Sequence, residues 1–211
     1  MDKELSRRAS KKAINKESII SAAEKLFLQK GFVGTFVDDI SKEAGFTIHT
    51  IYRYFVNKED LFFAVLLKWS KQNNAVWVEE LKYGRNGLDK IRLTNKVYYQ
   101  AYINNPEMFR LMNYLPENRL NCEKSTHYNE MGLMKDQTIK CYMDIINEGK
   151  ADGSINPNLD TKNTVFFEFC SLIGLLYMIP AMAKSYFWQE DGVDESGFLH
   201  FSMDLLANAL K

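Results

Sequence analysis

The sequence predicts an all-α protein, and three observations lead to this fold class. Apolar residues recur at helical spacing along most of the 211 residues. No stretch alternates apolar and polar residues for long enough to propose a strand. The breaks between the periodic stretches contain glycine, proline or asparagine, as in residues 84–87 and in GKADGSINPN, residues 149–158. We therefore expect helices joined by turns and loops.

Composition is that of an ordinary soluble globular protein. Hydrophobic residues make up 46% of the chain and charged residues 26%, and the 27 basic residues balance the 27 acidic ones. A net charge of zero excludes a protein that is basic over its whole surface, but it allows a local basic patch. The N-terminus lacks the apolar core of a signal peptide, so we expect a cytoplasmic protein.

Cysteine spacing gives no sign of a metal site or of a redox pair. Cys122, Cys141 and Cys170 form no CxxC or metal-like pattern, which fits unpaired thiols in a reducing compartment. Cys122, in a polar stretch, is the best candidate for a redox sensor. An inert thiol is the simpler interpretation.

The N-terminal segment is basic. We expect a first helix to begin at a cap on Asn15 and to end near Lys30, before Gly31. Ahead of it, residues 1–16 carry more basic than acidic side chains and are expected to form a flexible arm: Lys3, Arg7, Arg8, Lys11, Lys12 and Lys16 against Asp2 and Glu4. Such an arm either contacts DNA phosphates or the minor groove, or it serves only as a solubilising tail.

Residues 37–61, VDDISKEAGFTIHTIYRYFVNKEDL, have the pattern of a helix-turn-helix. Two short amphipathic helices, residues 37–44 and 48–55, flank a turn. Gly45 allows the positive φ that the turn requires, and Thr47 can cap the second helix. Apolar residues from both helices are expected to meet in one small core, formed by Ile40, Ala44, Phe46, Ile51 and Phe55. The second helix of such a motif enters the major groove of DNA.

At these residues the chain resembles the TetR family of transcriptional regulators. The residues in register with the family pattern are Val37, Asp39, Ile40, Ala44, Gly45, Thr47, Thr50, Ile51, Tyr52, Tyr54, Phe55, Lys58 and Leu61. The resemblance implies a helix-turn-helix DNA-binding domain over residues 1–56. It also implies a helical domain over residues 57–211 that binds an effector and dimerises. Phe36 replaces the usual Ser or Thr at the start of the first helix, so the cap and phosphate contact of that position cannot be transferred. Ile48-His49 replaces a small or basic pair, so base preference cannot be transferred either.

Eight residues at the second helix and its flanks are expected to contact DNA: Thr47, Ile48, His49, Thr50, Tyr52, Arg53, Tyr54 and Lys58. The resemblance implies phosphate contacts for Thr50, Tyr52, Tyr54 and Lys58. Arg53 could bond guanine O6 and N7, with Ile48 and His49 beside it. Thr47 could bind phosphate or only cap the helix. Tyr52 is equally consistent with packing, and Ile48 with covering the core.

Further helices are expected beyond the motif. One begins at Lys58, capped by Asn57, and runs unbroken to Gly84. Others follow over residues 88–104, 106–115 and 128–149, the last ended by Gly149, with loops at residues 116–126 and 190–196. An apolar helix begins after Asp160 or Thr161 and ends or kinks at Pro180. The final helix carries Phe198, Phe201, Leu205, Leu206 and Leu210.

The apolar helix over residues 165–179 needs burial on more than one side. Glu168 and Pro180 argue against a membrane span, and we expect no membrane partner. The family dimerises through its last two helices, so we expect a homodimer with these residues at the interface: Phe169, Ile173, Gly174, Tyr177, Phe201 and Leu205. The alternative is a helix buried within the core of one copy.

The body is rich in aromatic residues and methionine, most of which are expected in the core. The family keeps a ligand cavity within these helices, and adaptable methionine and tyrosine side chains suit a small, mostly apolar effector. Few basic residues lie among them, so a strongly anionic ligand is not expected. The candidate lining residues are Trp77, Tyr99, Tyr102, Met112, Met134 and Tyr177.

Catalytic and metal-binding motifs are absent from the sequence. His49, His127 and His200 are widely spaced, and no HExxH, GxSxG, P-loop or GxGxxG pattern occurs. We therefore expect no enzyme, no cofactor and no metal. The predicted function is a ligand-responsive transcriptional regulator, a repressor released from a palindromic DNA operator by its effector. A DNA binder with a filled body, and an enzyme or carrier using the body alone, are the alternatives.

Overall fold

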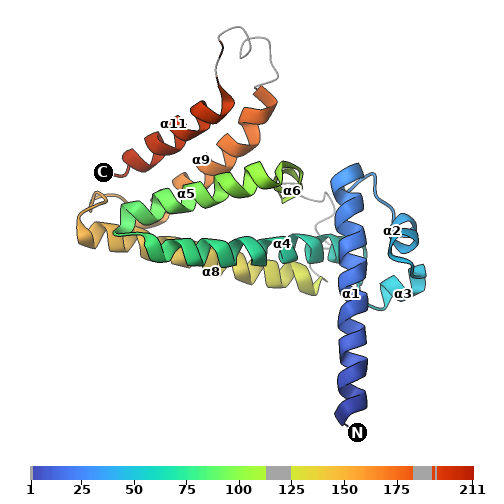
Figure 1. The fold of residues 1–211 in the computed structure, drawn as a ribbon. Helices are drawn as coiled ribbons and strands as arrows, with labels where there is room; N and C mark the ends of the chain where they lie inside the picture. The colour runs from blue at the N-terminus through green and yellow to red at the C-terminus, as the bar shows by residue number, and fades with distance from the viewer. Residues whose placement is uncertain (1, 113–124, 183–191, 193) are drawn as a thin grey trace. The chain divides into compact units, whose positions relative to one another are not determined.

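A computed structural model of the chain describes residues 2–112, 125–182, 192 and 194–211 (Figure 1). These residues form helices and turns and no strand, as predicted. They divide into two compact units, Met1–Lys71 with Arg110–Met134 and Gln72–Phe109 with Lys135–Lys211. The functional division after residue 56 stays a prediction. Cys122, the loop at residues 116–124 and much of the loop at residues 190–196 lie outside the described residues.

Helix α1 spans Asp2–Lys30 and begins far earlier than predicted. The expected flexible arm is therefore wrong, because a continuous run of strong helix formers without glycine or proline propagates the helix through residues 2–16. Asn15 is not a cap; it lies in mid-helix, where its amide donates to the Tyr54 hydroxyl at 3.5 Å. The predicted end is confirmed, since Gly31 takes a φ of 70° and donates its N–H to the Phe27 carbonyl at 2.9 Å.

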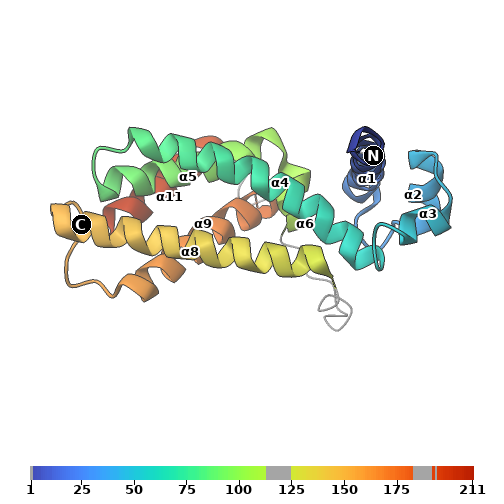
Figure 2. The ribbon, with the colours of Figure 1, turned by 90° about the horizontal axis from the view of Figure 1, so that it is seen from below.

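The helix-turn-helix is formed by α2 (Val37–Ala44) and α3 (Ile48–Tyr52) (Figure 2). Ile40, Ile51 and Phe55 are buried as predicted. Helix α3 is shorter than predicted and ends before Phe55. The chain leaves the helix there because the Val56 N–H is bonded to the Asp60 carboxylate at 3.0 Å and not to a helical carbonyl.

Helix α4 (Lys58–Glu80) continues into a 3-10 turn, η1 (Leu81–Tyr83), and so covers the predicted length. The predicted cap is confirmed, since Asn57 Oδ1 accepts the Asp60 N–H at 2.8 Å. The first turns of α4 pack with α1 in the first unit, where the rings of Phe27 and Phe62 meet edge-on at 5.4 Å.

Helices α5 (Gly87–Asn104), α6 (Pro106–Met112) and α8 (Thr126–Asp152) begin within two residues of the predicted positions. The prediction that α8 ends at Gly149 is wrong. The helix continues to Asp152, and Gly153 then turns the chain with a φ of 79°. The glycine at 149 serves close packing instead. A Cβ built on Gly87 would lie 2.3 Å from the Gly149 Cα, so the two backbones touch.

Helices α9 (Thr161–Met182) and α11 (Glu195–Asn208) pack side by side (Figure 1). Both are capped by aspartate: Asp160 accepts the Asn163 N–H at 2.8 Å and Asp194 the Gly197 N–H at 2.6 Å. The backbone of α9 remains helical to Met182, so the helix does not end at Pro180, and the alternative prediction of a kink there stays a prediction. Residues 161–179 of α9 are long and apolar enough to cross a membrane by composition alone, and 33% of that stretch is buried in the protein.

Candidate functional site

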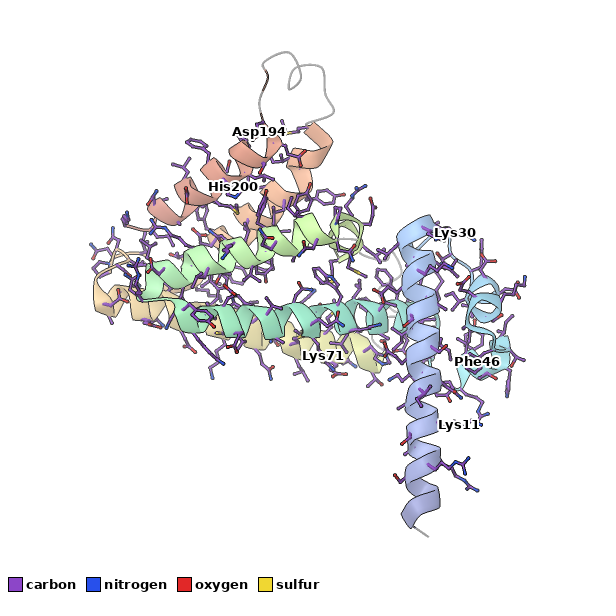
Figure 3. The ribbon with its side chains drawn as sticks, viewed as in Figure 1. Lys11, Lys30, Phe46, Lys71, Asp194 and His200 are labelled. Atoms are coloured by element: carbon purple, nitrogen blue, oxygen red, sulfur yellow. The ribbon has the colours of Figure 1, made fainter. Side chains whose placement is uncertain are left out.

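The turn between α2 and α3 is fixed by backbone bonds at both ends. Gly45 has φ 70° and ψ 28°, and the Phe46 N–H donates to the Ser41 carbonyl at 3.0 Å (Figure 3). The Thr47 hydroxyl accepts the Thr50 N–H at 3.2 Å and so caps α3. Phe36 takes the N-cap position of α2 but supplies no side-chain bond, as its departure from the family pattern indicated.

The structure brings the eight candidate DNA-contacting residues together on α3 and its flanks. Thr47, Ile48, His49, Tyr52 and Arg53 are exposed, and Thr50, Tyr54 and Lys58 are half-buried. Among the described residues, neither the Arg53 guanidinium nor the His49 ring has a hydrogen-bond or ion-pair partner. These two donor groups are therefore available at the surface of α3.

Lys58 is engaged within the first unit. Its ammonium lies over the ring of Phe32, 4.2 Å from the centroid, in a cation–π contact. Partial burial lowers the pKa of Lys58, and the charge of Glu59 offsets part of this shift. Sequence reasoning missed this contact, because it treated Lys58 as a cation with little packing.

The acidic side chains of α2 are each paired with a lysine. Lys30 of α1, labelled in Figure 3, reaches Asp39 at 3.0 Å. Lys25 of the same helix reaches Glu43 at 2.5 Å, and Lys42 binds Asp38 one turn away. The bond and the charge of Asp38 raise the pKa of Lys42. Such exposed pairs contribute little stability. They do offset negative charge on the helix that precedes α3.

A buried carboxylate anchors the turn that follows α3. Asp60 is 2% exposed and accepts three hydrogen bonds: from the Val56 N–H at 3.0 Å, and from the Ser125 hydroxyl and His127 Nδ1 at 2.7 Å each. Burial alone would raise the pKa of Asp60, but the bonds from His127, Ser125 and Val56 outweigh it and lower this pKa to about 2.

The same network reaches α1 and α8. Lys16 Nζ lies 3.0 Å from His127 Nε2, and the Ser125 hydroxyl also accepts the Tyr128 N–H at 3.0 Å, which caps α8. The beginnings of α4 and α8 and the middle of α1 therefore meet at Asp60. No spacing in the sequence indicates this, because the partners are up to 111 residues apart in the chain.

The six candidate effector-lining residues are divided between the two units, so their lining of one cavity stays a prediction. Trp77, Tyr99 and Tyr102 are buried in the second unit, whereas Met112 and Met134 belong to the first and Tyr177 is half exposed on α9. The three buried rings have polar partners: Trp77 Nε1 donates to Thr94 at 2.9 Å, and the hydroxyls of Tyr99 and Tyr102 lie 2.9 and 3.0 Å from Ser196 and Glu195. The Tyr99 ring also meets His200 at 4.7 Å (Figure 3).

The candidate dimer residues lie on the two helices that pack side by side, α9 and α11. Phe169, Tyr177, Phe201 and Leu205 are exposed, with Phe201 62% accessible, and Ile173 is half-buried. A Cβ built on Gly174 would meet nothing within 4 Å. Further exposed apolar side chains on α9 extend this surface: Phe166, Phe167, Met178 and Met182. We call these residues of α9 and α11 the apolar face.

Metal-binding and thiol chemistry gain no support in the described part of the chain. No group of three or more His, Cys, Asp or Glu residues there is placed to hold a metal ion. Cys141 and Cys170 are free thiols. Burial, followed by the charge of Asp144, raises the pKa of Cys141, which makes it less reactive as a nucleophile.

Comparison with known proteins shows which families and structures the chain resembles. Residues 19–65 match the family model described as "Bacterial regulatory proteins, tetR family". A fatty acid metabolism regulator protein of Bacillus subtilis is 26% identical over 148 residues, which cover 68% of this chain and 72% of that protein.

Solved structures share the whole fold. The fatty acid degradation regulator FadR of Bacillus halodurans has a TM-score of 0.69 at 19% identity, covering 91% of this chain and 94% of that one. FadR of Bacillus subtilis in complex with stearoyl-CoA also reaches 0.69 at 19% identity, covering 92% and 99%. The ketosteroid transcriptional regulator KstR2 of Mycobacterium tuberculosis reaches 0.67 at 15% identity, covering 93% and 94%. The chain is therefore similar to the TetR family of transcriptional regulators, in sequence over the helix-turn-helix and in its all-helical fold over more than nine-tenths of its length.

Proposed function

We propose that this protein is a cytoplasmic, homodimeric repressor that leaves a palindromic operator when a small, mostly apolar effector binds. The exposed α3, with its unpaired Arg53 and His49 beside a capped turn, is the observation that carries the proposal. A helix that offers free donors at its surface is suited to reading base edges in the major groove. No membrane or catalytic role is needed to account for these features.

The DNA contacts are of two kinds: contacts to base edges, which read the sequence, and contacts to phosphates, which position the protein on the duplex. Arg53 donates to guanine O6 and N7, with His49 and Ile48 beside it. The hydroxyls of Tyr52 and Tyr54 donate to phosphate oxygens. The Thr47 and Thr50 hydroxyls are bonded to each other at 2.9 Å, so this pair has one proton left to donate to a phosphate. The Lys58 ammonium leaves the Phe32 ring to join them. The N-terminal turns of α1, with exposed Arg7, Lys11 and Lys12, add a phosphate-binding surface on a helix (Figure 3).

Dimerisation through the apolar face accounts for a surface that water would not favour. Phe169, Tyr177, Phe201 and Leu205 of one copy would pack on the same residues of the second across a two-fold axis, and Gly174 lets the helices approach closely. Two copies then present two α3 helices to half-sites about 10 bp apart or wider.

The effector is the agent that shifts the dimer between DNA-binding and released arrangements. Several related regulators carry fatty acid metabolism in their names, and one was solved with stearoyl-CoA. A ligand with a long apolar chain suits the buried aromatic residues Trp77, Tyr99 and Tyr102. Such an effector needs to prefer the released arrangement by only a few kcal/mol to switch most of the population.

Selection of bound fragments from the native genome tests the DNA-binding role. We expect enrichment of a two-fold symmetric sequence. Arg53→Ala should cost about 1–3 kcal/mol mainly at one base pair of each half-site, whereas Lys58→Ala should weaken all sequences alike and reduce the salt dependence by about one unit. Arg85→Ala, an exposed cation of the second unit, is the matched control. Unchanged sequence preference in Arg53→Ala would refute the reading role.

A further inference from the structure

Three buried polar side chains lie inside the second unit, one on each of three helices. Asn95 of α5, Tyr142 of α8 and Glu168 of α9 are 2%, 2% and 0% exposed. The amide atoms of Asn95, the Tyr142 hydroxyl and both Glu168 carboxylate oxygens have no hydrogen-bond partner within the described part of the chain. We call these three residues the Glu168 cluster.

The members of the cluster are close enough to perturb one another. Burial raises the pKa of Glu168 to about 7, and the Asn95 amide counters part of this shift. Burial also raises the pKa of Tyr142, and the charge of Glu168 raises it further. Although these side chains interact electrostatically, none of their polar atoms meets hydrogen-bond geometry. They are therefore neighbours in the interior whose polar atoms are left without a hydrogen-bond partner.

This arrangement is costly for a protein interior. Buried polar groups are almost always hydrogen-bonded, and an unpaired one loses its interaction with water without replacement. The surroundings are mostly apolar, since Tyr142 belongs to the same buried core as Trp77, Val97 and Val165. Tyr98 is a further titratable side chain near enough to raise the pKa of Tyr142. Three unpaired groups at one point indicate that a further molecule completes their bonding.

The chemistry of the unpaired atoms identifies the missing group. Glu168 and the Asn95 carbonyl offer acceptors, while the Asn95 amide and the Tyr142 hydroxyl offer donors. A carboxylate would leave the acceptors unpaired and bring a second negative charge beside Glu168. An ammonium would leave the donors unpaired. A hydroxyl or a water molecule donates and accepts from a single atom. A carboxamide presents two N–H donors and a carbonyl acceptor at separate positions, which suits polar atoms on three different helices.

We propose that the Glu168 cluster binds the neutral carboxamide group of an otherwise apolar ligand. This inference rests on the proposed function, because it names the polar end of the effector. The apolar part of the ligand lies against the surrounding core residues. Free fatty acid anions are disfavoured at this site by the Glu168 carboxylate.

Calorimetric titration of the full-length protein with octanamide, octanoate and octylamine tests the proposal, since the three probes share one chain and differ only in the polar end. We expect octanamide to bind at least about ten-fold more tightly than either other probe. Glu168→Leu should abolish this preference, and Tyr142→Phe, which keeps the ring, should weaken octanamide several-fold. Asp136→Asn, an exposed acid of α8 changed to an amide, is the matched control and should alter nothing.

Glu168→Gln provides a second variant of nearly identical shape in case Glu168→Leu does not fold. It should retain octanamide binding within a few-fold and bind octanoate more tightly than the wild type does. Equal affinity for the three probes, no binding of any probe, a preference for octylamine, or a preference that survives both Glu168 variants overturns the inference. So does a structure in which water alone bridges the cluster in the presence of octanamide. Failure of the proposed function is distinct, because the wild-type protein would then retain no duplex DNA.

Discussion

Replacement of Asp60 by asparagine tests the network that holds the turn after α3. Both carboxylate oxygens are used: Oδ2 accepts the Val56 N–H, and Oδ1 accepts from Ser125 and His127. Asparagine has one oxygen and one amide group. In either orientation its N–H₂ therefore faces a donor, so one side of the network must break.

Two features of the structure give similar magnitudes for the stability that Asp60→Asn should lose. A hydrogen bond to a charged group contributes about 1.5–3 kcal/mol, and the variant loses at least one such bond while leaving a buried donor unpaired. The lowering of the Asp60 pKa from 3.8 to about 2 corresponds to about 2 kcal/mol. We expect Asp60→Asn to lower the free energy of unfolding by about 2–4 kcal/mol.

Urea unfolding at neutral pH, followed by circular dichroism, measures this loss. Asp38→Asn is the control, because Asp38 is exposed and paired only with Lys42, and it should change stability by less than about 0.5 kcal/mol. The folded pKa of Asp60 is depressed, so its contribution is fully present above pH 3.8 and is lost as the pH falls towards about 2. If Asp60→Asn unfolds at the same urea concentration as the wild type, the network does not hold the turn.

Three further changes address other parts of the molecule. Phe201→Asp should convert the proposed dimer into monomers in sedimentation velocity, while Leu133→Asp, at an equally exposed site of the first unit, should not; a dimer that persists in Phe201→Asp rules out the apolar face as the interface. The folded pKa of Glu168, about 7, is raised from its usual 4.5, so wild-type stability should fall by about 3 kcal/mol between pH 4.5 and 7, and Glu168→Gln should remove this fall. A variant that keeps the same pH slope in urea titrations would assign it to another group. Thr35→Val should cost about 1–2 kcal/mol in thermal unfolding, because the buried Thr35 hydroxyl donates to the Leu26 and Gly31 carbonyls at 3.1 and 2.7 Å, and an unchanged melting temperature would show that these bonds are dispensable.

Local chemistry made the helix-turn-helix predictable. Helix α2 occupies the predicted residues because Gly45 can adopt a positive φ and ends it there. Thr47 caps α3 as expected, since the capping bond joins residues three apart. Asn57 and Asp160 likewise cap the helices that begin directly after them, each through an N–H three residues further along. Signals that act over one turn of helix are visible in the sequence.

Features that depend on residues far apart in the chain could not be predicted from the sequence. Gly149 resembles a helix stop until Gly87, 62 residues earlier, is found against it. Lys58 resembles a free cation, yet Phe32 covers it. Nothing in the sequence links Asp60 to its partners, because Ser125 and His127, at the beginning of α8, are 65 and 67 residues further along the chain. The sequence also offered no sign that Met112 and Met134 belong to the first compact unit and the buried aromatic residues to the second.

Helix α9 shows why its sequence pattern allowed several interpretations. Its buried residues are Val165, Leu172, Leu176 and the acid Glu168. Its exposed residues include large apolar side chains such as Phe166, Phe167 and Phe169. An outward apolar side fits both a lipid bilayer and a protein partner. Helix α11 decides between the bilayer and the protein partner. It continues the apolar face with Phe201 and Leu205, but with 14 residues and an exposed Asp204 it is too short and too polar to span a bilayer. A span of hydrocarbon needs about 20 apolar residues, so a second protein copy, with the same two helices, is the better complement to this face.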